Sequence, residues 1–303
     1  MKNTQLPAAQ NGGAVPVEVN TDFGEDAGAG FENTRMEEQR TPLLRMAQGL
    51  SPELNPAKGE YIRGLALGMI FNTATREVYD GREGLECVFC WKDYGYGQWI
   101  PRDLGGGYRG MLSPDDALVR ATISRMAEKY GSSARFKMPH YRDGQWSDEP
   151  ARTRDTNEAI ELVETGQLYA LYAPNGELSA DNYSRAIIPF TSTAMGAYTG
   201  YVTRHSNALW PQRDGTRKPA PIFAYRWRLT TFGDKNGKGE FSNWRIDLVP
   251  PGGSFIDALY AKNDPYLHHA ARAFFTLCKT GIVKPDDTAA PAADRADSED
   301  VPF

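Results

Sequence analysis

One stretch of the sequence, CWKDYGYGQWIPRDLGGGYRG (residues 90–110), alternates aromatic and basic side chains at short intervals. Flat rings stack on unpaired bases and cations neutralise phosphates, and stacking contributes about 1–3 kcal/mol per base. The pattern therefore predicts a surface that binds single-stranded nucleic acid, with packing in a core or a turn as the alternative for each ring. The candidate residues are Trp91, Lys92, Tyr94, Tyr96, Trp99, Arg102, Tyr108 and Arg109.

Further arginines extend this candidate site. In the segment YRWRL (225–229), alternation along a strand places Arg226 and Arg228 on one face and the apolar side chains on the other. Trp227 is therefore expected in the core if the arginines face solvent, so the cations and rings of this strand cannot all contact one ligand. The arginines added to the candidate site are Arg185, Arg226, Arg228 and Arg245.

Other motifs do not support catalysis or metal binding. Cys87 and Cys90 have the spacing of half a zinc site, but no second pair follows, and residues three apart on a strand point to opposite faces. We expect buried free thiols there. The glycines of LGGGYRG lack the Lys-Ser/Thr pair of a P-loop, and no serine–histidine–acid set or carboxylate pair has a convincing context. We expect no enzyme activity, no metal and no cofactor.

The net charge of −5 is unevenly distributed along the chain. Residues 285–303 contain six acids and one base, and residues 1–40 contain seven acids and three bases. Between Arg185 and Arg245, by contrast, ten Lys or Arg face three acids. Acidic arms around a basic middle predict a polyanionic partner and an acidic interaction tail.

Strand-like and helix-like stretches alternate through the body. Strands are expected at 61–71, 84–94 and 97–103, at 159–174 with a break near Gly166, and at 183–190; residues 221–232 and 240–249 should form a hairpin. Helices are expected from Ser113 to Gly131, over residues 191–209, and over a last stretch whose apolar face starts at Leu267 and which stops at Gly281. The pattern predicts an α+β fold: an OB-fold-like, curved β-barrel decorated with helices, although the spacing fits other α+β layouts too.

Composition divides the chain of 303 residues into three parts. Residues 1–38 are predicted to be a disordered acidic arm, residues 39–283 the OB-fold-like ssDNA-binding domain, and residues 284–303 a disordered acidic tail. No stretch reaches the roughly 20 apolar residues of a membrane span, and the N-terminus lacks a secretory apolar region. We expect no membrane partner and a cytoplasmic location, which is the host cytoplasm if a phage encodes the protein.

The chain ends on DSEDVPF, which resembles the C-terminal tip of bacterial single-stranded DNA-binding proteins. In that family the terminal Phe enters an apolar pocket of replication and repair enzymes, a basic residue receives its carboxylate, and the acids meet a basic rim. The resemblance implies that the tip binds host or phage replication and repair proteins. The residues that would bind are Asp297, Glu299, Asp300, Val301, Pro302 and Phe303.

The body resembles a family of tailed-phage proteins of similar size. The resemblance lies in LLRMAQGLSPEL, FNTATREVYDG, ECVFCWKDYGYGQWIPRD and GEFSNWRID. It implies a phage single-stranded DNA-binding protein of replication or recombination. The basic and aromatic side chains predict that the protein coats DNA without strong sequence preference, the tip adds repair proteins as partners, and the oligomeric state stays open. The alternatives are a structural or virion-associated protein without nucleic-acid binding, and a strand-annealing recombination protein.

Overall fold

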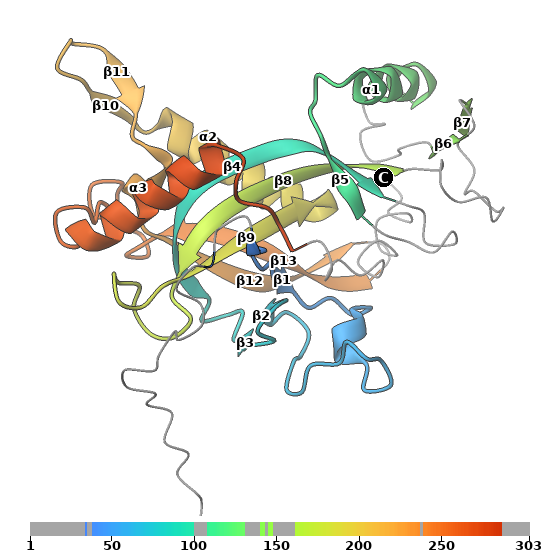
Figure 1. Cartoon of the computed structure of the whole chain (residues 1–303), viewed down its shortest axis with the longest axis horizontal. Coiled ribbons are helices and arrows are strands. Elements are labelled where there is room, and N and C mark those ends of the chain that lie inside the picture. The colour runs from blue at the N-terminus through green and yellow to red at the C-terminus, as the bar shows by residue number, and fades with distance from the viewer. Residues whose placement is uncertain are drawn as a thin grey trace, which may run out of the picture. The chain divides into compact units, whose positions relative to one another are not determined.

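The computed structural model describes Thr34 and residues 38–99, 108–130, 140–142, 145–147, 161–236 and 239–286 (Figure 1). Three α-helices occur in these ranges: α1 (Ala117–Tyr130), α2 (Met195–Asn207) and α3 (Pro265–Lys279). The strands are β1 (Leu44–Met46), β2 (Ile70–Asn72), β3 (Val78–Tyr79), β4 (Leu85–Trp99), β5 (Tyr108–Leu112), β6 (His140–Arg142), β7 (Gln145–Ser147), β8 (Glu161–Tyr172), β9 (Ser184–Thr191), β10 (Leu209–Pro211), β11 (Arg217–Pro219), β12 (Trp227–Asn236) and β13 (Gly239–Leu248).

One antiparallel sheet organises the fold, with strand order β13-β12-β4-β8-β9. Strand β4 is its longest member and pairs with β8 over most of its 15 residues. On the other edge of β4, β12 pairs with its first residues and β5 with its last. Smaller sheets are formed by β1-β2-β3, β6-β7 and β10-β11.

The main sheet is open in the part of the chain that the structure describes. Its outer strands, β13 and β9, do not pair with each other, and residues 42–48 connect them instead. The amide of Ile187 in β9 donates to the carbonyl of Pro42 (2.9 Å), and the side chain of Gln48 bonds the backbone of Ser242 in β13 (2.8 and 3.1 Å). Such isolated contacts do not make a continuous ladder, so the expected OB-fold-like barrel is not confirmed. The mixture of helices and antiparallel strands confirms the α+β class.

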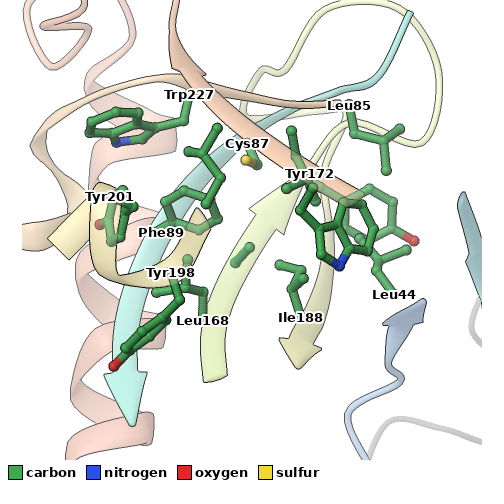
Figure 2. Close-up of a cluster of buried hydrophobic side chains, with 14 of the residues drawn as sticks. Leu44, Leu85, Cys87, Phe89, Leu168, Tyr172, Ile188, Tyr198, Tyr201 and Trp227 are labelled. Carbon is green, nitrogen blue, oxygen red and sulfur yellow. The ribbon is translucent and has the colours of Figure 1, made fainter. Parts of the chain in front are cut away.

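Two apolar cores cover the two faces of the sheet. The α2-side core holds Phe89 of β4, Tyr201 of α2 and Trp227 of β12, among others, and Figure 2 shows their side chains converging. The α3-side core contains Val88 of β4 and Phe274 of α3. Since successive strand residues point to opposite faces, β4 contributes side chains to both cores and is buried on each side.

Helix α3 shows how local sequence produces these elements. The carboxylate of Asp264 accepts a hydrogen bond from the amide of Leu267 (2.9 Å), which caps the helix, and Pro265 occupies its first turn. The buried residues Leu267, Phe274 and Cys278 share one face at helical spacing. Gly281 follows the helix with φ of 73°, which an L-residue adopts only at a cost.

The predicted elements are confirmed with shifted boundaries. Helix α1 begins at Ala117, four residues after the predicted cap, and the strand predicted at 61–71 is limited to β2. The strands predicted at 84–94 and 97–103 are one strand, β4. The predicted break near Gly166 is wrong: β8 is continuous there, because Gly166 pairs with Tyr94 of β4 and with Phe190 of β9. The missing side chain makes room for the ring of Tyr198, whose atoms would lie 2.6–2.8 Å from an added Cβ.

Candidate nucleic-acid interface

Trp91 and Tyr94 are three residues apart on β4 and face opposite sides of the sheet, and an extra residue just before them decides which side each one takes. The register with β8 shifts between Phe89 and Trp91, so Cys90 forms a bulge. After the bulge, Trp91 packs on the α3 side with its ring centroid 5.8 Å from that of Phe275. Tyr94 packs on the α2 side. The rings that the sequence grouped together therefore do not form one surface.

Tyr94 is the half-buried ring on the α2 side, and its contacts are internal. Its hydroxyl donates to Glu164 Oε1 (2.6 Å), and its ring lies nearly parallel to Tyr198, with centroids 6.4 Å apart. Burial, followed by this hydrogen bond, raises the pKa of Tyr94, so the phenol stays protonated. Lys92 is exposed two residues earlier, whereas Tyr96 is only 7% exposed and packs against Val119 of α1.

The other four candidates from this stretch lie at the end of β4, in β5 or outside the described residues. Trp99 is half-buried at the end of β4, and Arg109 is exposed in β5. Tyr108 begins β5, but its side chain is not described. Arg102 lies outside the described residues. Of the predicted stretch, Lys92 and Arg109 are thus the exposed cations among the described side chains.

Two of the predicted arginines have internal partners. Arg226 Nη1 donates to Glu86 Oε1 (2.9 Å), and Nη2 lies 3.8 Å from Asp264 Oδ2. Arg185 places its guanidinium carbon 5.4 Å from the ring centroid of Phe274. These contacts connect the sheet to α3 and its cap, so both side chains have structural roles that their sequence context does not reveal.

The remaining two arginines lie on the outer face of the β12–β13 ribbon. Alternation is strict there: Trp227 is fully buried, whereas Arg228 is half-buried and Arg245 exposed. The guanidinium of Arg245 lies 4.8 Å from the ring centroid of Phe232. Arg228 donates to the carbonyl of Glu83 (3.1 Å). The predicted opposition of arginines and Trp227 across this strand is confirmed.

Sequence reasoning missed Phe232 and Phe241, which share this outer face. Both are half-buried, and neither belongs to a core cluster of the described residues. In the ladder Phe232 lies opposite Asn243, and Phe241 opposite Asp234. The signal that identifies them is the parity of LTTFGD and EFSNWRID: counted from buried Trp227 and Trp244, both phenylalanines fall on solvent-facing positions. We call Arg228, Phe232, Phe241 and Arg245 the outer ribbon face.

The thiols are buried structural groups. Cys87 lies in the α2-side core and Cys90 in the α3-side core, which confirms the expected opposite orientation. Burial raises the pKa of both thiols and is the first cause of the rise to about 12 for Cys278. Among the described residues, no group of three His, Cys, Asp or Glu side chains is arranged to hold a metal ion.

The acidic tip lies outside the described residues, as do most of the two predicted arms. The described chain ends at Asp286, whose amide donates to the carbonyl of Thr41 (2.9 Å). None of the helices in the described ranges is long and apolar enough to cross a membrane. The partner-binding residues of the tip therefore remain a prediction.

The structure defines a mixed α+β protein built on one open antiparallel sheet. The chain belongs to the Pam3 phage gp34-like protein family, whose family model matches residues 10–284, and is thus a bacteriophage-type protein. No curated protein and no solved structure matches it. The resemblance to phage proteins is confirmed at this level.

Proposed function

We propose that this phage protein binds single-stranded DNA on the outer ribbon face. The observation that carries the proposal is the pairing of Arg245 with Phe232 on the solvent side of β12–β13, at 4.8 Å. This contact brings a cation that can bind a phosphate next to an aromatic ring that can stack on a base once the guanidinium turns to the phosphate. Phe241 and Arg228 repeat both chemistries on the same face.

The contacts of the other candidate groups favour this face. On β4, Trp91 packs in the α3-side core, Tyr96 packs against Val119, and Tyr94 is already stacked on Tyr198. Arg226 and Arg185 are held against α3 and its cap. The outer ribbon face combines aromatic and basic side chains that no core cluster of the described residues uses.

In the proposed role, the protein coats single-stranded DNA in phage replication, recombination or repair, within the host cytoplasm and without catalysis or cofactor. An OB-fold-like relationship would suit this role, because OB folds bind single strands on curved antiparallel sheets. The tip resembling that of bacterial single-stranded DNA-binding proteins would recruit host or phage replication and repair proteins. Strand annealing is compatible with the same binding face.

The proposal is tested by titrating fluorescent oligothymidine with the unmodified protein and with the variants Phe232→Ala and Arg245→Ala and comparing their affinities. We expect Phe232→Ala to weaken binding about 5- to 150-fold, which corresponds to the ~1–3 kcal/mol of one stacked base. Tyr266→Ala is the matched control, because it removes a ring that is 78% exposed at the start of α3. Equal affinity of the unmodified protein for single strands and duplex, or no affinity for either, refutes the proposal and favours a virion role.

The tail provides a separate test. Free acidic residues compete with DNA for cations, so deleting residues 285–303 should tighten DNA binding. Deleting only Pro302 and Phe303 should leave DNA affinity nearly unchanged and abolish docking on a host exonuclease or helicase. Unchanged docking of the shortened protein contradicts the proposed role of the tip.

A further inference from the structure

The β10–β11 hairpin is an ordered ribbon that contributes little to the cores. Its strands pair in the register Leu209–Pro219, Trp210–Lys218 and Pro211–Arg217, and all but Trp210 of these residues are exposed. In Figure 1 it extends from the end of α2 away from the main sheet. Such a projecting ribbon needs a reason other than core packing.

The hairpin is firmly built at both ends. At its base the indole of Trp210 donates to the hydroxyl of Tyr225, two residues before β12. At its tip the carboxylate of Asp214 accepts from the amide (2.9 Å) and hydroxyl (2.6 Å) of Thr216. Arg217 donates to the carbonyl of Leu209 (3.0 Å), which fixes one strand to the other. The ribbon is therefore held in one shape before any partner arrives.

The hairpin carries a positive charge that is not neutralised by neighbouring side chains. Arg213, Arg217 and Lys218 face a single acid, Asp214, whose carboxylate is already engaged by Thr216. Within the described part of the chain, Arg213 and Lys218 form no ion pair or side-chain hydrogen bond. Two cations thus stand exposed on a rigid projection with no internal partner there.

The edges of the hairpin are unsuited to pairing with another protein strand. Pro211 ends β10 and Pro219 ends β11, and a proline lacks the amide that a further strand would need. The exposed apolar surface is limited, since Leu209 is the exposed large hydrophobic residue of the hairpin, at 40%, and Trp210 is half-buried. These features disfavour a protein partner and leave a polyanion as the ligand that fits.

We infer that the β10–β11 hairpin is a second nucleic-acid contact, which binds the sugar–phosphate backbone through Arg213 and Lys218 and rests on the proposed DNA-binding function. A rigid two-stranded ribbon is narrow enough to follow a nucleic-acid strand or groove. Cations without rings contact phosphates and carry no base preference. The hairpin would therefore add affinity and salt dependence to the stacking supplied by the outer ribbon face.

The test is a salt titration of oligothymidine binding by the double variant Arg213→Gln/Lys218→Gln in the full chain. Each phosphate contact contributes about 0.7 to the slope of log K against log salt on single strands, so the slope should become about 1.4 less steep. Arg217 is retained because it fixes the two strands together. The control is Lys58→Gln/Arg63→Gln, which removes two exposed cations from another loop and should leave the slope unchanged.

The outcomes separate the inference from the function on which it rests. A slope equal to that of the unmodified protein, with DNA still bound, overturns the hairpin contact and leaves the proposed function standing. Binding to duplex alone, with a slope that depends on the hairpin, supports the contact and refutes the single-strand function. Absence of binding to both nucleic acids refutes both proposals.

Discussion

Replacing Arg226 by Met should destabilise the fold and leave the DNA-binding surface intact. Its guanidinium lies 2.9 Å from Glu86 and 3.8 Å from Asp264, and it covers the ring of Tyr260 with 5.5 Å between guanidinium carbon and centroid. Glu86 is 6% exposed, so loss of Arg226 leaves a carboxylate without its partner in a site that water barely reaches.

The magnitude follows from that burial. Removing one partner of a buried ion pair destabilises a protein by about 3–5 kcal/mol. The side chain of Arg226 is 22% exposed, so residual solvent screening favours the lower end, about 3 kcal/mol. For a domain of this size each kcal/mol lowers Tm by about 2–4 °C, which gives a decrease of about 6–12 °C.

Thermal denaturation and oligothymidine titration below the transition measure the two effects separately. Arg245→Met is the matched control: the residue is exposed, so we expect a loss of at most about 1 kcal/mol in stability but weaker DNA binding. In the double variant Glu86→Leu/Arg226→Met most of the lost stability should return, because no charge is left buried. An unchanged Tm with weaker DNA binding in Arg226→Met would refute the structural role.

Two further predictions concern packing and pH. Gly166→Ala should lower the free energy of unfolding by about 1–3 kcal/mol, because its Cβ would collide with the ring of Tyr198. The Cβ of Gly200→Ala in α2 meets nothing within 4 Å, so this variant should raise the free energy of unfolding by up to about 1 kcal/mol. Chemical denaturation measures both changes. Burial raises the pKa of Cys278 to about 12, so the folded state holds its proton longer than the unfolded state. Its contribution to stability is complete below pH 9 and declines between pH 9 and 12; Cys278→Ala should lack this component of the decline.

The parts of the fold that follow from the sequence are those governed by one local rule. The outward Arg228 and the buried Trp227 of β12 follow from the alternation of a strand, and the end of α3 follows from its apolar stripe and Gly281. The candidate site is less predictable because it depends on register. The bulge at Cys90 puts Trp91 on the α3 side and Tyr94 on the α2 side, the reverse of what alternation counted from Phe89 predicts, and no residue type in CVFCWKDY indicates an inserted position.

On the outer ribbon face, residues whose type suggests a core position lie on the solvent side. Phe232 and Phe241 look like core residues when they are read singly, since Phe is among the residues most often buried. Their exposure follows from the parity that Trp227 and Trp244 impose on the paired strands, and that parity is known only when both tryptophans are known to be inside. Composition therefore identifies a basic, aromatic region, while pairing decides which of its side chains a ligand can reach.

The number of cations that a ligand can reach also sets how strongly DNA binding should depend on salt. Ten Lys or Arg lie between Arg185 and Arg245, and if all of them contacted phosphates the slope on single strands would be about −7. Several are engaged elsewhere: Arg226 pairs with Glu86, Arg204 lies 3.8 Å from Asp247, and the guanidinium of Arg185 lies over the ring of Phe274. Arg217 holds β11 to the carbonyl of Leu209, so the cations left on the hairpin and the outer ribbon face are Arg213, Lys218, Arg228 and Arg245.

Four such contacts predict a slope of about −2.8 for oligothymidine binding. Fluorescence titrations of the protein lacking residues 285–303, between 50 and 300 mM salt, measure this slope without competition from the acidic tail. A slope near −7 would mean that the internal ion pairs open on binding, which contradicts the structural role assigned to Arg226. A slope near zero would remove phosphate contacts from the mechanism and, with them, the basic surplus as an argument for a DNA partner.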